Sequence, residues 1–120
     1  MKRDMELVRK ILLETEASDN VPMVWIVLDI EGYQPELVSY HVKIMAQAGL
    51  IEAEDLTTLA SFEWQPKSLT WDGHEFLETV KNETVWAKTM EVVRGNGGSV
   101  AFAVFKELAI QFSKSIFMPS

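Results

Sequence analysis

The chain has 120 residues, of which 48% are hydrophobic, and its formal charge is -7. This length fits one domain with a buried core, and the absence of cysteine excludes disulfides and cysteine-ligated zinc. No stretch is apolar enough for a signal peptide or a membrane span, so we expect a cytoplasmic protein.

The first predicted element is an amphipathic helix over residues 4–16, with Asp4 as its N-cap and Pro22 in the segment that follows. Its apolar side chains recur at helical spacing: Leu7, Val8, Ile11 and Leu12. Residues 24–30 are short, β-branched and aromatic. This run predicts a strand, although a buried helical turn would show a similar pattern.

A second helix is predicted over residues 35–48, because Pro35 and Glu36 suit a first helical turn and Gly49 suits the position after the last. A strand should follow from Leu50. The expected inward face comprises Leu37, His41, Ile44, Met45 and Ala48. The expected outward row comprises Glu36, Ser39, Lys43 and Gln47.

Residues 54–64 lack helical spacing and predict two strands joined by a turn, a hairpin that residues 67–69 can complete. Thr70 can cap a third helix, and Asn82 can begin a fourth that ends at Gly95. Residues 95–98 predict a flexible hinge. Ser99 would then cap a last helix with a wide apolar stripe: Ala101, Val104, Phe105, Leu108, Phe112 and Ile116.

The order of these elements is typical of winged helix-turn-helix domains, in which a helix runs into a hairpin and the hairpin turns into another helix. The predicted fold is therefore α+β, a winged helix-turn-helix-like domain with additional C-terminal helices. Residues 1–81 would form the body, and residues 82–120 a helical extension of the same compact domain. The predicted shared core comprises Leu7, Val8, Ile11, Leu37, Ile44, Met45, Leu50, Leu69 and Phe76.

Four blocks of the sequence together resemble a family of uncharacterised bacterial and phage proteins, domain of unknown function 2513. These blocks are Met1–Leu12, Tyr40–Ala53, Leu69–Leu77 and Gly97–Ser99. The resemblance implies a winged-helix-like domain carried by prophages or other mobile elements. It implies no established activity and no catalytic residues.

The sequence offers little for catalysis or metal binding. His41 and His74 are its two histidines, and the stretch from His74 lacks the second histidine of the HExxH zinc motif. Neighbouring acids such as Glu14 and Glu16 are typical of a solvated surface. The turn before Ser99 lacks the lysine of a phosphate-binding loop. We expect no enzyme, metal or cofactor.

Two functions remain open. In the first, the protein binds DNA: three residues read the groove (Ser39, Lys43 and Gln47) and three contact phosphate (Arg9, Lys10 and Lys67). In the second, the acidic charge and scattered cations indicate a module that binds a host or phage protein. The apolar stripe of the last helix predicts a homodimer or, alternatively, a helix that completes its own core.

Overall fold

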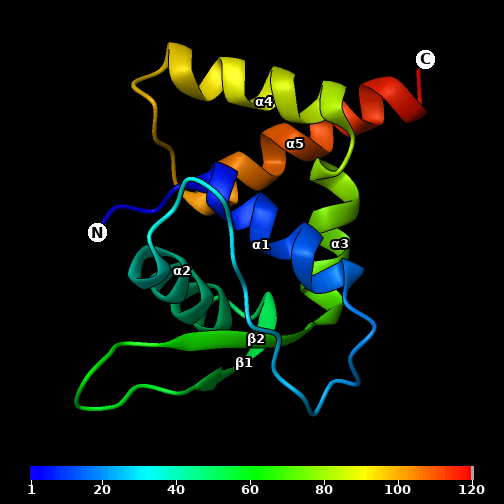
Figure 1. Ribbon diagram of the computed structural model, residues 1–120. Coiled ribbons are helices and arrows are strands. Elements are labelled where there is room, and N and C mark those ends of the chain that lie inside the picture. The colour runs from blue at the N-terminus through cyan, green and yellow to red at the C-terminus, as the bar shows by residue number, and fades with distance from the viewer. Residues whose placement is uncertain (120) are drawn as a thin grey trace. The chain divides into compact units, whose positions relative to one another are not determined.

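The computed structural model describes residues 1–119, and within them the fold is α+β, as predicted. Its elements are α1 (Met5–Ala17), α2 (Pro35–Gln47), β1 (Ile51–Asp55), β2 (Trp64–Leu69), α3 (Trp71–Val80), α4 (Glu83–Gly95) and α5 (Phe102–Phe117) (Figure 1). The chain divides into two compact units inside α3, one of residues Met1–His74 and one that begins at Glu75. The sequence placed the boundary of the body after residue 81.

Helix α1 begins where the sequence predicts. The Asp4 carboxylate accepts hydrogen bonds from the backbone N–H groups of Glu6 at 2.9 Å and Leu7 at 3.3 Å. These bonds satisfy two of the donors that a helix start leaves unpaired. The apolar face is buried as predicted: Leu7, Val8, Ile11 and Leu12.

Helix α2 buries only part of the face predicted. Its buried side chains are Val38, Ser39, His41, Val42 and Met45, so the inward positions of His41 and Met45 are confirmed. Leu37 and Ile44 are only half-buried, and Ala48 is exposed. Val38, Val42 and Met45 have the same i, i+4, i+7 spacing as Leu37, His41 and Ile44, so helical spacing alone could not choose between the two stripes.

Strands β1 and β2 form an antiparallel hairpin, in which Ile51 pairs with Leu69 and Asp55 pairs with Trp64. The register shifts after Glu52, so Lys67 is an extra residue on β2. Such a bulge is one of the few places where a strand accommodates proline, and here Pro66 precedes it. The hairpin was predicted, but along the sequence β1 begins sooner after α2, and β2 ends closer to α3, than the predicted strands within residues 54–64.

Residues 24–30 do not form the predicted strand. The Ile26 N–H donates to the Pro66 carbonyl at 2.8 Å, and the Leu28 N–H donates to the Gln65 side-chain oxygen at 3.0 Å. Pro66 has no N–H to donate in return, and a side chain at Gln65 replaces a backbone acceptor. The segment therefore lies beside β2 without a regular ladder.

The end of α2, the start of β1 and the start of α3 are held together at Thr70. Its hydroxyl donates to the Gly49 carbonyl and accepts from the Gly73 N–H, and its own N–H donates to the Leu50 carbonyl. Gly49 has a φ of +79°, which suits glycine after a helix end. The predicted Gly49 and Thr70 roles are confirmed.

The second unit is built around aromatic side chains. Phe76 packs against Phe102 and Phe105, with ring centroids 5.0 and 6.3 Å apart, and Trp86 lies 5.5 Å from Phe105. Helix α4 begins at the predicted cap, Asn82, and packs along α5 (Figure 1).

The start and the apolar stripe of α5 differ from the prediction. The N-cap is Ala101, which makes no side-chain hydrogen bond, so the predicted cap at Ser99 is wrong. The turn before it belongs to the end of α4, because the Gly98 N–H donates to the Val93 carbonyl. Within α5 only Phe105 and Ala109 are buried, and Val104 is exposed.

Candidate functional site

The first residue of the predicted groove-reading row, Ser39, is buried. Its side chain is 4% exposed, and its hydroxyl donates to the Trp64 carbonyl on β2 at 3.3 Å. The predicted outward position of Ser39 is wrong, because the hairpin packs against this side of α2. Ser39 joins the helix to the hairpin and is not available to read a base.

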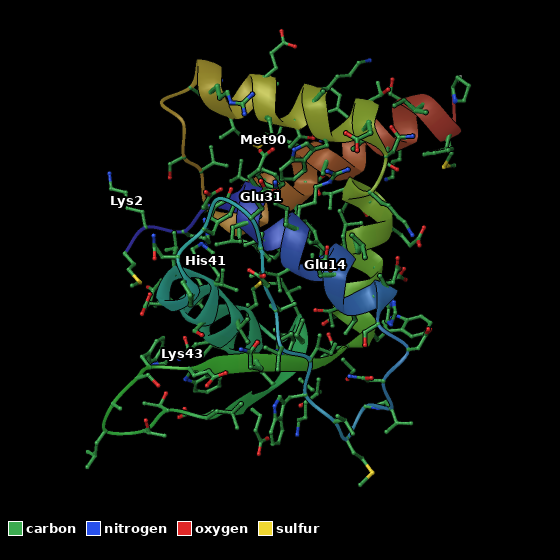
Figure 2. All side chains as sticks on the ribbon, viewed as in Figure 1. Lys2, Glu14, Glu31, His41, Lys43 and Met90 are labelled. Carbon is green, nitrogen blue, oxygen red and sulfur yellow. The ribbon has the colours of Figure 1, made fainter. Side chains whose placement is uncertain are left out.

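Lys43 lies on the side of α2 that faces the hairpin (Figure 2). Its Nζ is 5.9 Å from the centre of the Phe62 ring, a distance at which the cation and the ring face attract each other. Asp55 is also close enough to feel this charge. The pKa of Asp55 lies below its usual value because the Thr57 N–H and hydroxyl stabilise the carboxylate, with a smaller effect from Lys43.

Lys67 also lies beside an acid. Its Nζ is 3.2 Å from the Glu54 carboxylate on the paired strand. The two lysines of α2 and the hairpin are thus each next to a carboxylate of β1. Glu52 is exposed on the same strand.

The remaining predicted contacts are dispersed. Gln47 is exposed at the last position of α2, whereas Arg9 and Lys10 are on α1. The Lys10 Nζ lies 5.8 Å from the centre of the Tyr33 ring. The structure therefore brings Ser39 and Lys43 to the hairpin, which also carries Lys67, but it places Arg9 and Lys10 on a separate element.

The tip of the hairpin is ordered and carries no cation. Leu56 donates to the Glu63 carbonyl and Thr58 to the Ser61 carbonyl, while the Thr58 hydroxyl accepts from the Ser61 N–H. Leu59 is fully exposed between these bonds. Residues 56–63 contain no lysine or arginine, so the tip presents an exposed apolar side chain and no cation of its own.

The most apolar exposed stretch of the first unit is residues 21–27. Met23 is 86% exposed, Val27 73% and Trp25 43%. Residues 24–30 of this region were predicted to form a strand, and their exposure was not predicted. The sequence carries no signal for it, because Ile26, Val27 and Leu28 are all apolar although their burial alternates.

Of the two histidines, His41 has the inward position that its helix spacing predicted. His41 is fully buried; its Nε2 accepts the Asp4 N–H at 2.8 Å, and its Nδ1 lies 2.9 Å from the Leu37 carbonyl. These partners require a neutral ring with the proton on Nδ1. Figure 2 shows His41 on the side of α2 toward the N-terminal segment. His74 is exposed.

Across residues 1–119, no three histidine, aspartate or glutamate side chains gather in a group that could hold a metal ion. In the same part of the chain, no helix combines the length and the apolar character that crossing a membrane requires.

Comparison with known proteins gives the family. The family model described as "Hypothetical protein (DUF2513)" matches residues 2–99. An uncharacterized protein of Haemophilus influenzae is 34% identical over 109 residues, which cover 91% of this chain and 92% of that protein. No solved structure matches the chain significantly. The chain therefore belongs to the DUF2513 family, as its four sequence blocks indicated.

Proposed function

We propose that the Met1–His74 unit is a non-enzymatic module that binds a protein partner. The observation that carries the proposal is the exposed apolar run at residues 21–27, with Met23 and Val27 among its most exposed side chains. Exposed apolar groups that cluster on a soluble surface are typical of protein–protein contact sites.

Electrostatics support the same function. Residues 18–34, which include the apolar run, contain Asp19, Asp29 and Glu31 and no lysine, arginine or histidine. DNA affinity depends mainly on cations that neutralise phosphates. On the hairpin side, Lys43 and Lys67 lie next to acids, which lowers the positive potential that they present.

A pull-down from a nuclease-treated lysate of the encoding organism tests the proposal. We expect a defined protein to be retained by the wild-type chain and lost with Val27→Ser. Leu59→Ser is the matched control, since it removes another exposed aliphatic side chain at the hairpin tip. Both changes should leave stability within about 0.5 kcal/mol. Retention that disappears with nuclease would contradict the proposal.

DNA binding by a winged-helix regulator of mobile-element origin is the second candidate. It is supported by one observation, the direct succession of α2 and the β1–β2 hairpin, a helix followed by a wing. However, residues 18–34 separate α1 from α2, whereas the helices of a helix-turn-helix are joined by a turn of about 3–4 residues.

Substitution on α2 tests this second candidate. Lys43→Glu should weaken DNA binding across a salt series if α2 lies in a groove, because one phosphate contact is lost. Lys88→Glu is the control, because it makes the same charge change at an exposed position of α4, outside α2 and the hairpin. Equal DNA affinity of the wild-type and Lys43→Glu proteins would exclude α2 from a DNA interface.

A further inference from the structure

The segment beside β2 has one side bonded and one side open. The N–H groups of Ile26 and Leu28 both point to β2, where they meet the Pro66 carbonyl and the Gln65 side chain. In an extended chain, the backbone groups of alternate residues point to opposite sides. The backbone groups of Trp25, Val27 and Asp29 therefore point away from β2.

Those outward groups have no partner in the part of the chain that the structure describes. None of the hydrogen bonds within residues 1–119 involves the backbone N–H or carbonyl of Trp25, Val27 or Asp29. An open row of backbone donors and acceptors is a template on which another extended chain can pair. The segment thus presents an open backbone edge next to the two-stranded β1–β2 sheet.

The side chains next to this edge also favour pairing. Trp25 and Val27 are exposed on one face of the segment, while Ile30 is buried on the other. Proteins usually protect an open edge with lysine, proline or a covering loop. Here the edge itself carries tryptophan and valine, two residue types that pair well across strands.

Charge selects between the two kinds of occupant, a second copy of this chain and a different protein. The edge is flanked by Asp29 and Glu31 and preceded by Asp19, with no cation in residues 18–34. A second copy would bring the same acids to the same edge. A strand with lysine or arginine would instead place opposite charges next to them.

We propose that residues 25–29 accept an extended segment of a partner protein as an added strand, and that this segment alternates apolar and basic residues. The inference rests on the proposed protein-binding function and specifies its mode. Backbone hydrogen bonds to Trp25, Val27 and Asp29 supply affinity, as in other cases of strand addition. The acids nearby supply the preference for a basic partner.

The probe is a short fluorescein-labelled peptide in which valine and lysine alternate, titrated with the full chain. Val27→Pro removes the outward N–H without removing either bond to β2, and should weaken binding about tenfold or more. Val27→Thr is the matched control, because it keeps the N–H and the branched shape. It should bind within about threefold of the wild type.

Amide hydrogen exchange in the wild-type chain provides a readout that does not depend on the folding of a variant. Peptide binding should slow exchange at Trp25, Val27 and Asp29 more than at Ile26 and Leu28, whose N–H groups are already bonded. A companion peptide that alternates valine and glutamate should bind at least about tenfold more weakly, since its charges repel the flanking acids.

Three results would overturn the inference: no binding of the valine–lysine peptide, equal binding by Val27→Pro and Val27→Thr, or slowed exchange confined to another surface. The proposed function would survive such a result if nuclease-resistant capture of a protein persisted in Val27→Pro, which would move the contact to other residues. Loss of all protein capture in the wild type would refute both.

Discussion

Because Gly73 has no Cβ atom, the first turn of α3 can lie against the backbone of Leu50, the residue before β1. Gly73 is buried in the first turn of α3, and a Cβ built on it would collide with the Leu50 carbonyl oxygen. The same carbonyl accepts the Thr70 N–H at 3.1 Å. The Leu50 carbonyl is therefore held by the hydrogen bond from Thr70, and it can lie this close to α3 only because Gly73 has no Cβ.

Gly73→Ala is expected to lower the free energy of unfolding by about 1–3 kcal/mol, because the added methyl group must displace backbone atoms. The measurement is urea denaturation followed by circular dichroism. Gly95→Ala is the control, since a Cβ there meets nothing within 4 Å. The control should be neutral or slightly stabilising, and equal losses at both glycines would contradict the steric explanation.

His41 is a second residue whose contacts predict a large effect. Its ring nitrogens bond the Asp4 N–H, at the start of α1, and the Leu37 carbonyl within α2. His41→Leu keeps an apolar volume but leaves the part-buried Asp4 N–H without this partner, which should cost about 1–3 kcal/mol. The Leu37 carbonyl keeps its bond within the helix.

Thermal denaturation of His41→Leu and His74→Leu separates this role from a general effect of removing histidine. His74 is exposed, so its variant should remain within about 0.5 kcal/mol of the wild type. If both variants melted at the wild-type temperature, the bonds of His41 would contribute nothing to the packing of α1 on α2.

Tyr33 predicts how stability changes at high pH. Burial raises the pKa of its phenol, and the carboxylates of Asp4 and Glu6 raise it further. Ionisation is therefore harder in the folded chain than in the unfolded one. The associated stability is fully present below the ordinary tyrosine pKa of about 10 and is lost as pH rises through the higher folded value.

Melting temperatures measured from neutral pH to above about pH 10 test this effect. The wild type should lose more stability over the alkaline range than Tyr33→Phe, which has no phenol to ionise at this position. Parallel losses in the two proteins would show that Tyr33 ionises equally easily in the folded and unfolded states.

At the scale of elements, the helix boundaries were largely predictable, whereas the buried face was predicted correctly for α1 and only in part for α2. Asp4, Pro35, Gly49, Thr70 and Asn82 have the expected boundary roles. Capping depends on residues a few positions apart, so a sequence reveals it. The burial of Ser39 depends instead on the Trp64 carbonyl, 25 positions away, and no local pattern contains that information.

The same reasoning explains the segment at residues 24–30. Its composition predicted a strand, but only the Ile26 N–H bonds the backbone of β2, and no strand forms. Whether it becomes a strand depends on Pro66, which cannot donate a backbone hydrogen bond. The exposed edge of the candidate site follows from that pairing, and it could not be predicted from the segment alone.

Ser39→Ala measures the link between α2 and the hairpin. Loss of the hydroxyl bond to Trp64 should cost about 0.5–1.5 kcal/mol, whereas Gln47→Ala on the exposed end of α2 should change stability by less than about 0.5 kcal/mol. Chemical denaturation of both variants gives the comparison. A cost at Gln47 as large as that at Ser39 would mean that α2 is held mainly by its exposed end.

At the scale of the whole molecule, charge and apolar exposure favour different contacts. A net charge of -7 keeps copies apart in general, and three of the acids that contribute to it lie in residues 18–34. Helix α5 is different, since Val104 and Phe117 are exposed and its two lysines, Lys106 and Lys114, outnumber its one acid, Glu107. Self-association is therefore more favourable through α5 than through the acidic edge beside β2.

Light scattering of the full chain tests the homodimer predicted for α5. We expect twice the mass of the monomer, and Val104→Glu should shift it to the monomer by placing a charge in an apolar contact. Lys106→Ala changes the net charge by the same amount roughly 200° around the helix, so this control should stay dimeric. A full-length protein that scatters as a monomer would refute the dimer. It would also mean that the apolar side chains of α5 remain open to a different partner.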